Sequence, residues 1–142
     1  MAYASQSHIE MAAGGPERLV ELADWNNDGV ADTGVITEAQ RSADGWIDSY
    51  ARARFATPIA TPSDTLIRVA AEEAIYWIRK QRGMASDDHR KDHAEREQWC
   101  KDLAAGKVRP DEPLPTRSTA IRSQYVSHET RTVSRERTKG FW

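Results

Sequence analysis

Length and composition limit the classes of protein to which this chain can belong. It has 142 residues, of which 39% are hydrophobic and 30% are charged, and its formal net charge is −2. These values predict one soluble domain with a tail, and no apolar run approaches the roughly 20 residues that a membrane-spanning helix needs. The N-terminus lacks the basic segment and apolar stretch of a secretory signal, and the single cysteine, Cys100, excludes an internal disulfide.

Charge is distributed unevenly along the chain. Residues 1–106 contain 12 Lys and Arg against 18 Asp and Glu, whereas residues 107–142 contain 8 against 4. We therefore expect a helical domain over residues 1–106 and an extended, basic C-terminal arm over residues 107–142. A basic arm beside an acidic domain predicts docking onto an acidic partner, a nucleic acid or a neighbouring copy of the chain.

Two short helices are expected near the N-terminus. Ser7 followed by Glu10 has the form of a capping box, which predicts a helix that ends near Ala13. Pro16 then opens a second short helix, because its fixed φ angle suits a first helical turn. This second helix leads the chain into an acidic segment.

Three longer helices follow. Apolar residues recur at three- and four-residue steps from Val35 to about Arg54, which predicts the first long helix. The same spacing recurs after a proline-containing crossing and predicts a second long helix, for which Thr61 or Ser63 can serve as N-cap. Residues 86–104 form the third, whose narrow apolar face predicts a position on the outside of the bundle. No segment alternates with a period of two, so the fold class is predicted to be all-α, a small helical bundle with two long helices and an outer one.

The five tryptophans and Tyr76 have different expected roles, according to their positions on the predicted helices. Trp46 and Trp99 fit the inner faces of their helices and are expected in the core. Tyr76 and Trp77 fall outside the apolar stripe of the second long helix, so we expect them to contact the third helix or another subunit. Trp25, Trp77 and Trp142 are open to interface roles.

The segment DWNNDGVAD, residues 24–32, resembles the start of an EF-hand calcium loop. An EF-hand takes side-chain oxygens at positions 1, 3 and 5, a glycine at 6, a carbonyl at 7 and a bidentate glutamate at 12. Position 12 is Val35 here, so the decisive carboxylate is missing. One interpretation is a weak calcium site with the ligands Asp24, Asn26, Asp28, Val30 and Asp32. The other is a tight turn in which Asp and Asn side chains accept backbone N–H groups and cap the following helix.

No other motif predicts a chemical activity. His89 and His93 stand four residues apart, a spacing that can bind zinc, but no third ligand is evident, and a solvated helix face is the favoured interpretation. Cys100 lies on an apolar stripe and is expected to be a buried, inert thiol. The sequence has neither a nucleophile motif nor a glycine-rich phosphate loop, so we expect that the protein is not an enzyme.

Several segments in order resemble one known family. The opening MAYASQSHIE, the acidic loop, the following helix and the ending SRERTKGFW are similar to the small head-to-tail connector proteins of Mu-like and other tailed phages and prophages. In that family a long helix ends in a Y-x-x-x-R-Y/F-x-x-P-like segment, which is matched by Tyr50, Arg54, Phe55 and Pro58. A terminal arm of the S-R-D-S-x-x-G-F kind is matched by Ser134, Arg135, Lys139, Gly140 and Phe141.

Two positions depart from the family pattern. Glu136 replaces an aspartate of the arm, and Asn26 replaces an aspartate of the acidic loop, which removes one charge from the possible calcium site. The sequence establishes no cofactor, and calcium is the candidate.

The resemblance implies a structural protein of the virion. Such proteins are expected to form a ring, commonly of twelve copies, beneath the portal, joining the DNA-filled head to the tail. The implied partners are the portal protein and a tail-side connector or terminator protein; DNA would pass without sequence-specific binding, and no membrane is involved. The implied location is the virion neck, and the host cytoplasm during assembly.

The arm is where we expect partner binding. Its prolines and small polar residues favour an extended chain, while arginines and terminal aromatics can supply most of the binding energy. The candidate residues are Arg131, Ser134, Arg135, Arg137, Lys139, Gly140, Phe141 and Trp142. Two alternatives stay open: a calcium-binding helical regulatory module, and a small DNA-binding protein that uses its basic tail.

Overall fold

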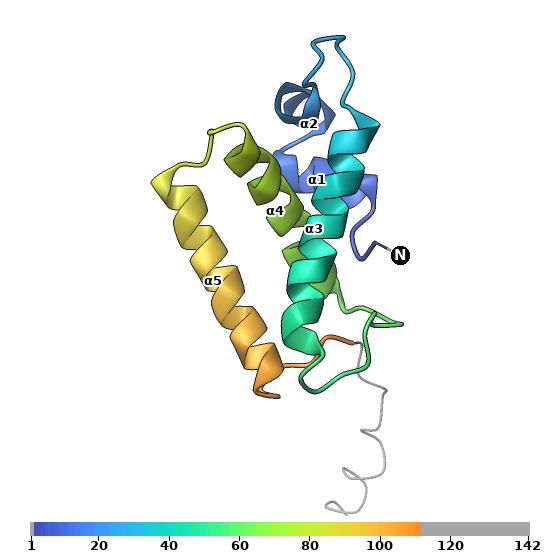
Figure 1. Cartoon of the computed structure of the whole chain (residues 1–142), viewed down its shortest axis with the longest axis vertical. Coiled ribbons are helices and arrows are strands. Elements are labelled where there is room, and N and C mark those ends of the chain that lie inside the picture. Colours follow the sequence, from blue (N-terminus) through green and yellow to red (C-terminus); the bar gives the residue numbers. More distant parts are fainter. Residues whose placement is uncertain (1, 112–142) are drawn as a thin grey trace, which may run out of the picture. The chain divides into compact units, whose positions relative to one another are not determined.

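Five α-helices make up the part of the chain that the structure describes. The computed structural model describes residues 2–111 (Figure 1). The helices are α1 (Gln6–Ala13), α2 (Pro16–Ala23), α3 (Thr33–Ala51), α4 (Asp64–Gln81) and α5 (Asp87–Ala104). Within residues 2–111 there is no β-strand, only an isolated bridge between Pro62 and Asp111. The predicted all-α class is confirmed.

Helices α3 and α4 form the centre of the core and lie side by side (Figure 1). Each buries residues at three- and four-residue steps, as the periodicity of the sequence predicts. On α3 these are Ile36, Ala39, Ala43, Ile47 and Ala51, and on α4 they include Leu66, Ala70, Ala74 and Ile78. The alanines reduce the thickness of the contact, so the two helix axes can approach closely. The remaining helices pack around this pair.

Helix α1 begins with a capping box that differs from the predicted one. Ser5 is the N-cap, and its hydroxyl accepts the backbone N–H of His8. In return the imidazole Nδ1 of His8 accepts the N–H of Ser5 at 3.0 Å. The predicted pair of Ser7 and Glu10 was wrong, because Ser7 already lies inside the helix.

Tyr3 ties the N-terminal segment to the core. Its hydroxyl donates to the Asp48 carboxylate of α3 and accepts the backbone N–H of Ile59 at 2.9 Å. Burial and the hydrogen bond to Asp48 raise the pKa of Tyr3 above its ordinary value, so the hydroxyl keeps its proton. Through this one side chain, residues before α1 are joined to α3 and to the crossing between α3 and α4.

Helix α5 lies on the outside of the bundle, as predicted. Ser86 caps it, and its buried positions are Arg96, Cys100 and Leu103, all in the second half of the helix. The chain then turns back along the body. Pro110 is buried, and its carbonyl accepts the N–H of Ser63 at 2.9 Å. Residues 107–111, which the sequence assigns to the arm, therefore lie against the start of α4.

Candidate functional site

The acidic loop between α2 and α3 brings three carboxylates together. One oxygen from each of Asp24, Asp28 and Asp32 lies within 4.8 Å of the others. The loop reaches this arrangement because Asn27 and Gly29 both adopt positive φ angles, 62° and 83°. Asparagine and glycine tolerate that backbone conformation better than other residues.

Most of these loop oxygens accept backbone N–H groups of the loop itself. Asp24 accepts from Asp28 at 3.0 Å and from Gly29 at 2.8 Å. Asp32 accepts from Trp25 at 2.8 Å and from Asn26 at 3.3 Å. Desolvation acts in the opposite direction, but the hydrogen bonds from Gly29 and Asp28 hold the pKa of Asp24 below its ordinary value. The turn that was one of the two predicted alternatives is thus formed.

The same alternative expected the loop to cap the following helix, and this part was wrong. Asp32 occupies the N-cap position of α3, but its side chain makes no capping hydrogen bond. Its carboxylate instead reaches back to the amides at the start of the loop. Three carboxylates at this separation can contact a single cation, although calcium takes six to eight oxygens. Val35, half-buried at the twelfth position, has no side-chain oxygen to add.

An aromatic pair lies beside this loop. The ring of Trp25 stacks on that of Trp77 from α4, with a centroid distance of 6.4 Å and an interplanar angle of 13°. The indole N–H of Trp25 donates to the carbonyl of Leu22 at 3.0 Å, and the residue remains 44% exposed. The sequence left both tryptophans open to interface roles, and the structure joins them into one surface feature.

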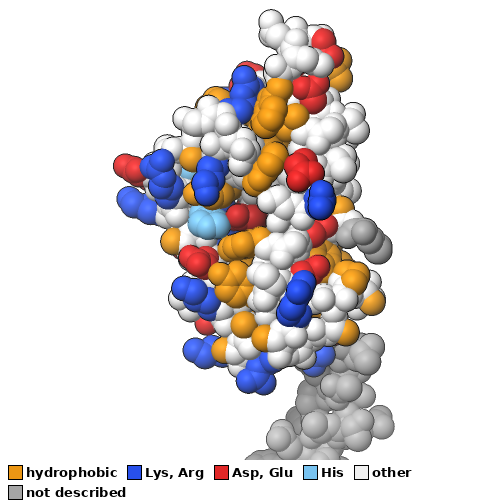
Figure 2. All heavy atoms as spheres, viewed as in Figure 1, with side chains coloured by type: hydrophobic (Ala, Val, Ile, Leu, Met, Phe, Trp, Pro, Cys, Tyr) orange, Lys and Arg blue, Asp and Glu red, His pale blue; other side chains and the backbone are white. Residues whose placement is uncertain are grey.

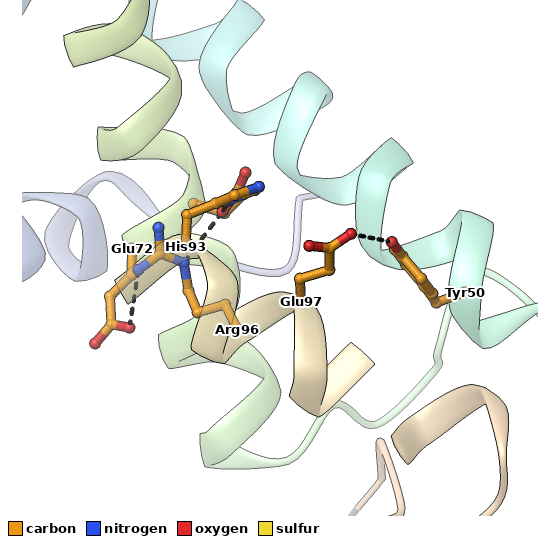
Figure 3. A network of polar contacts seen from close by, with 6 residues as sticks. Tyr50, Glu72, His93, Arg96 and Glu97 are labelled. Carbon is orange, nitrogen blue, oxygen red and sulfur yellow. Dashed lines mark hydrogen bonds and ion pairs between the residues drawn. The ribbon is translucent and has the colours of Figure 1, made fainter. Parts of the chain in front are cut away.

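A polar cluster joins α5 to α4 (Figure 3). Glu73 of α4 is buried, and one of its carboxylate oxygens accepts from Arg96 Nε at 3.1 Å and lies 3.0 Å from His93 Nδ1. The carboxylate of Glu72, whose side chain is 40% exposed, lies 3.9 Å from the same guanidinium. Removing a buried charge from water is costly unless it is paired, and here each charge has a partner.

Aromatic rings extend this cluster to α3. The imidazole of His93 stacks on Tyr76 at 4.5 Å between centroids and contacts the Trp46 ring of α3 at 5.3 Å. The Arg96 guanidinium lies 5.6 Å from the centroid of Tyr76, a cation–π arrangement. The expectation that Tyr76 contacts the third helix is confirmed. The interpretation of both histidines as a solvated helix face was wrong for His93, whose side chain is only 27% exposed.

His89 has a different role from His93. Its Nδ1 accepts the backbone N–H of Ser86 at 3.0 Å and completes a capping box at the start of α5. Cys100, eleven residues further along α5, is fully buried, as predicted. Desolvation, with smaller contributions from Glu73 and Glu97, raises the pKa of this thiol to about 12. A thiol that keeps its proton is a poor nucleophile, which agrees with the predicted inert role.

A groove of about 500 Å³ runs between α4 and α5 and reaches α1. Apolar atoms of Ala12, Val69, Ile75, Tyr76 and Trp99 line it, together with charged residues from both long helices. Arg79 of α4 is half-buried there, and burial together with the nearby Arg18 guanidinium lowers its pKa. No sequence motif indicates this groove, because its lining comes from three helices that are distant in the chain.

Comparison with known protein families identifies the family to which the chain belongs. A family model described as "Bacteriophage Mu, Gp36" matches residues 3–126, which include all five helices, the acidic loop and the groove. The chain belongs to this family. It is therefore a member of a phage protein family, in agreement with the coarser part of the resemblance read from the sequence. A comparison with curated proteins finds no match.

The Bacteriophage Mu, Gp36 match ends before the predicted binding residues of the arm. Those residues, Arg131, Ser134, Arg135, Arg137, Lys139, Gly140, Phe141 and Trp142, lie after residue 126 and also outside the described residues. Among residues 2–111, no helix is both long and apolar enough to cross a membrane.

Proposed function

We propose that this protein is a structural subunit of the virion neck, a head-to-tail connector that forms a ring beneath the portal. The observation that carries this proposal is the match of residues 3–126 to a bacteriophage Mu family. The order of motifs read from the sequence supports the more specific connector role. In this role the protein joins the DNA-filled head to the tail and binds the portal on one side and a tail-side connector or terminator protein on the other.

The surface of the described residues supports a role in assembly. Large hydrophobic side chains are exposed at Met11, Trp25, Val30 and Met84. On the face shown in Figure 2, hydrophobic side chains lie along the middle, and Lys and Arg side chains lie together with Asp and Glu side chains on the α5 side. A ring contact is heterologous, so one face of a subunit meets a different face of the next. A body with chemically different faces suits such a contact, and aromatic residues are enriched at interfaces.

The charge of the helical domain favours passage of DNA over its recognition. Residues 1–106 carry an excess of acidic residues, which repels phosphate groups. A channel lined by such subunits lets DNA move without binding its sequence. The alternative of a DNA-binding protein would need a basic folded surface, whereas the basic excess of this chain lies after residue 106.

Electron microscopy of virions tests the connector role. We expect a closed ring between portal and tail, of twelve copies if the family resemblance extends to ring size, and a monomer or small oligomer of the isolated protein. The protein is equally expected in the host cytoplasm during assembly. Its absence from the neck of mature particles would refute the proposal.

Truncation after Ala120 tests the role of the arm in this function. The cut leaves residues 2–111, with all five helices, in place. We expect a folded protein that fails to enter particles, because contacts of the arm must offset the entropy lost when it is ordered. A complementation assay measures the yield of tailed, infectious particles. A normal yield would show that the arm is not the anchor.

A calcium-binding role for the acidic loop is the second candidate. The grouping of Asp24, Asp28 and Asp32 within 4.8 Å favours it. Asn26 and the Val30 carbonyl complete the proposed ligand set, and the lack of a carboxylate at Val35 makes the site weak. In a connector, a bound calcium would stiffen the entry to α3.

A further inference from the structure

The unpaired charges on the two walls of the α4–α5 groove are of opposite sign, while Glu72 of α4 and Arg96 of α5, which also line it, pair with each other at 3.9 Å. Arg68 and Arg79 line it on α4, and Asp92 and Glu95 line it on α5. Within residues 2–111, the side chains of these four residues form no hydrogen bond or ion pair with one another or with any other residue. The unpaired charges of the groove are therefore basic on the α4 wall and acidic on the α5 wall, and Tyr76 is among the apolar residues that line it. A ligand that fits must place negative charge on one side and positive charge on the other.

The C-terminal sequence of the same chain has this pattern. In SRERTKGFW, residues 134–142, basic side chains stand at every second position, Arg135, Arg137 and Lys139, with Glu136 between two of them. Successive side chains of an extended chain point to opposite sides. An extended segment would thus direct its three basic residues to one side and Glu136 to the other.

We propose that the α4–α5 groove of one copy binds residues 134–142 of a second copy. Arg135, Arg137 and Lys139 face Asp92 and Glu95 on the α5 wall. Glu136 faces one of the two arginines of the α4 wall, Arg68 or Arg79, which stand eleven helical steps or about 16.5 Å apart. Phe141 and Trp142 follow and contact apolar atoms at one end of the groove. This inference rests on the proposed function, because a ring supplies each groove with a neighbouring copy.

The length of the groove agrees with this occupant. Its lining extends along α4 from Thr65 to Arg79, fourteen helical steps or about 21 Å at 1.5 Å per residue. An extended chain covers that length with about six or seven residues at roughly 3.3 Å each. The segment from Ser134 to Gly140, which holds all four charged residues of the pattern, has this length, so Phe141 and Trp142 follow at the end of the groove.

Cross-linking between purified full-length chains tests the proposal. One preparation carries Thr65→Cys at the groove, and a second carries Thr138→Cys in the arm; both side chains are small and uncharged. The native Cys100 is fully buried and does not compete for the reagent. A short bismaleimide added to the mixture should give a cross-linked dimer. Thr37→Cys, at an exposed position of α3 outside the groove lining, replaces Thr65→Cys in the control mixture, which should give none.

Charge reversal identifies which contacts hold the arm. Asp92→Arg with Glu95→Arg in the Thr65→Cys chain should reduce the dimer about tenfold, because like charges then oppose each other. Arg135→Glu with Lys139→Glu in the Thr138→Cys chain should restore most of it. Both reversed positions on α5 are exposed, so circular dichroism should show unchanged helicity.

Three results would overturn the inference. The first is equal cross-linking at Thr37 and Thr65, or no dimer at all. The second is a dimer that charge reversal does not change. The third concerns a chain that carries both Thr65→Cys and Thr138→Cys. If this chain cross-links only within itself, and the mixture of single variants gives no dimer, the occupant of the groove is the chain's own arm. The assay uses purified protein, so the cross-link can be absent although the protein is found in the virion neck. The cross-link can equally form although the protein is absent from the neck, so the two proposals fail separately.

Discussion

The buried Glu73 should be among the most sensitive positions of the helical domain. Its side chain is 9% exposed and that of Arg96 is 10% exposed. Substitution by alanine removes the acceptor at 3.1 Å from Arg96 Nε and the contact at 3.0 Å to His93. Breaking a buried ion pair from one side costs about 3–5 kcal/mol, because the other charge stays buried without its partner. Glu72, at 3.9 Å, compensates in part, so we expect a loss of about 3 kcal/mol.

Urea unfolding followed by circular dichroism measures this loss. At a slope of about 1.5 kcal/mol per M, the Glu73→Ala variant should unfold at a urea midpoint about 2 M lower. The matched control is Glu72→Ala, one residue earlier and 40% exposed, which should cost less than about 0.5 kcal/mol. The double variant Glu73→Ala with Arg96→Ala should lose less than the sum of the two single variants. Equal midpoints for Glu73→Ala and Glu72→Ala would refute the reasoning.

Three further predictions concern a helix cap and the acidic loop. Ser63→Ala should cost about 1 kcal/mol in urea unfolding, because it removes the acceptor of the Leu66 N–H at 3.2 Å; an unchanged midpoint would contradict this. The pKa of Asp24 is lowered from 3.8, so its contribution to the loop is complete above about pH 3.8 and is lost as the pH falls through the lowered pKa. Trp25 fluorescence should follow that loss on acidification, and Asp24→Asn should abolish the change. Calorimetric titration should detect weak calcium binding that Asp28→Asn removes; no heat at millimolar calcium, with helicity unchanged by chelator, would leave only the turn.

The helices could be predicted from the sequence because their signals are local. The apolar steps of α3 and α4 and the caps Ser63 and Ser86 lie within a few residues of the structure they determine. The predicted ends of the helices were less accurate. Helix α3 was expected to run from Val35 to about Arg54, and it runs from Thr33 to Ala51. Side-chain chemistry at an end can also mislead, as at α1, where a histidine takes the place that a glutamate usually fills in a capping box.

The candidate sites could be predicted only where one segment forms them. The acidic loop is contiguous, so its carboxylates could be identified from spacing alone. His93 could not be interpreted correctly, because its partner Glu73 lies 20 residues away on another helix. The same holds for Trp25 and Trp77, whose stacking depends on how the loop meets α4. The groove depends on three helices at once, and no periodicity within one helix encodes it.

The uneven attachment of α5 has a consequence for how this domain opens. Its buried residues lie at Arg96, Cys100 and Leu103, and residues 87–95 contribute none. Amide hydrogen exchange reports such differences, since segments with few buried contacts open at low free energy. The first two turns of α5 should therefore exchange before the last two. We therefore expect the groove to open at its Arg79 end before its Trp99 end, so that a strand of chain would enter at the first and come to rest at the second.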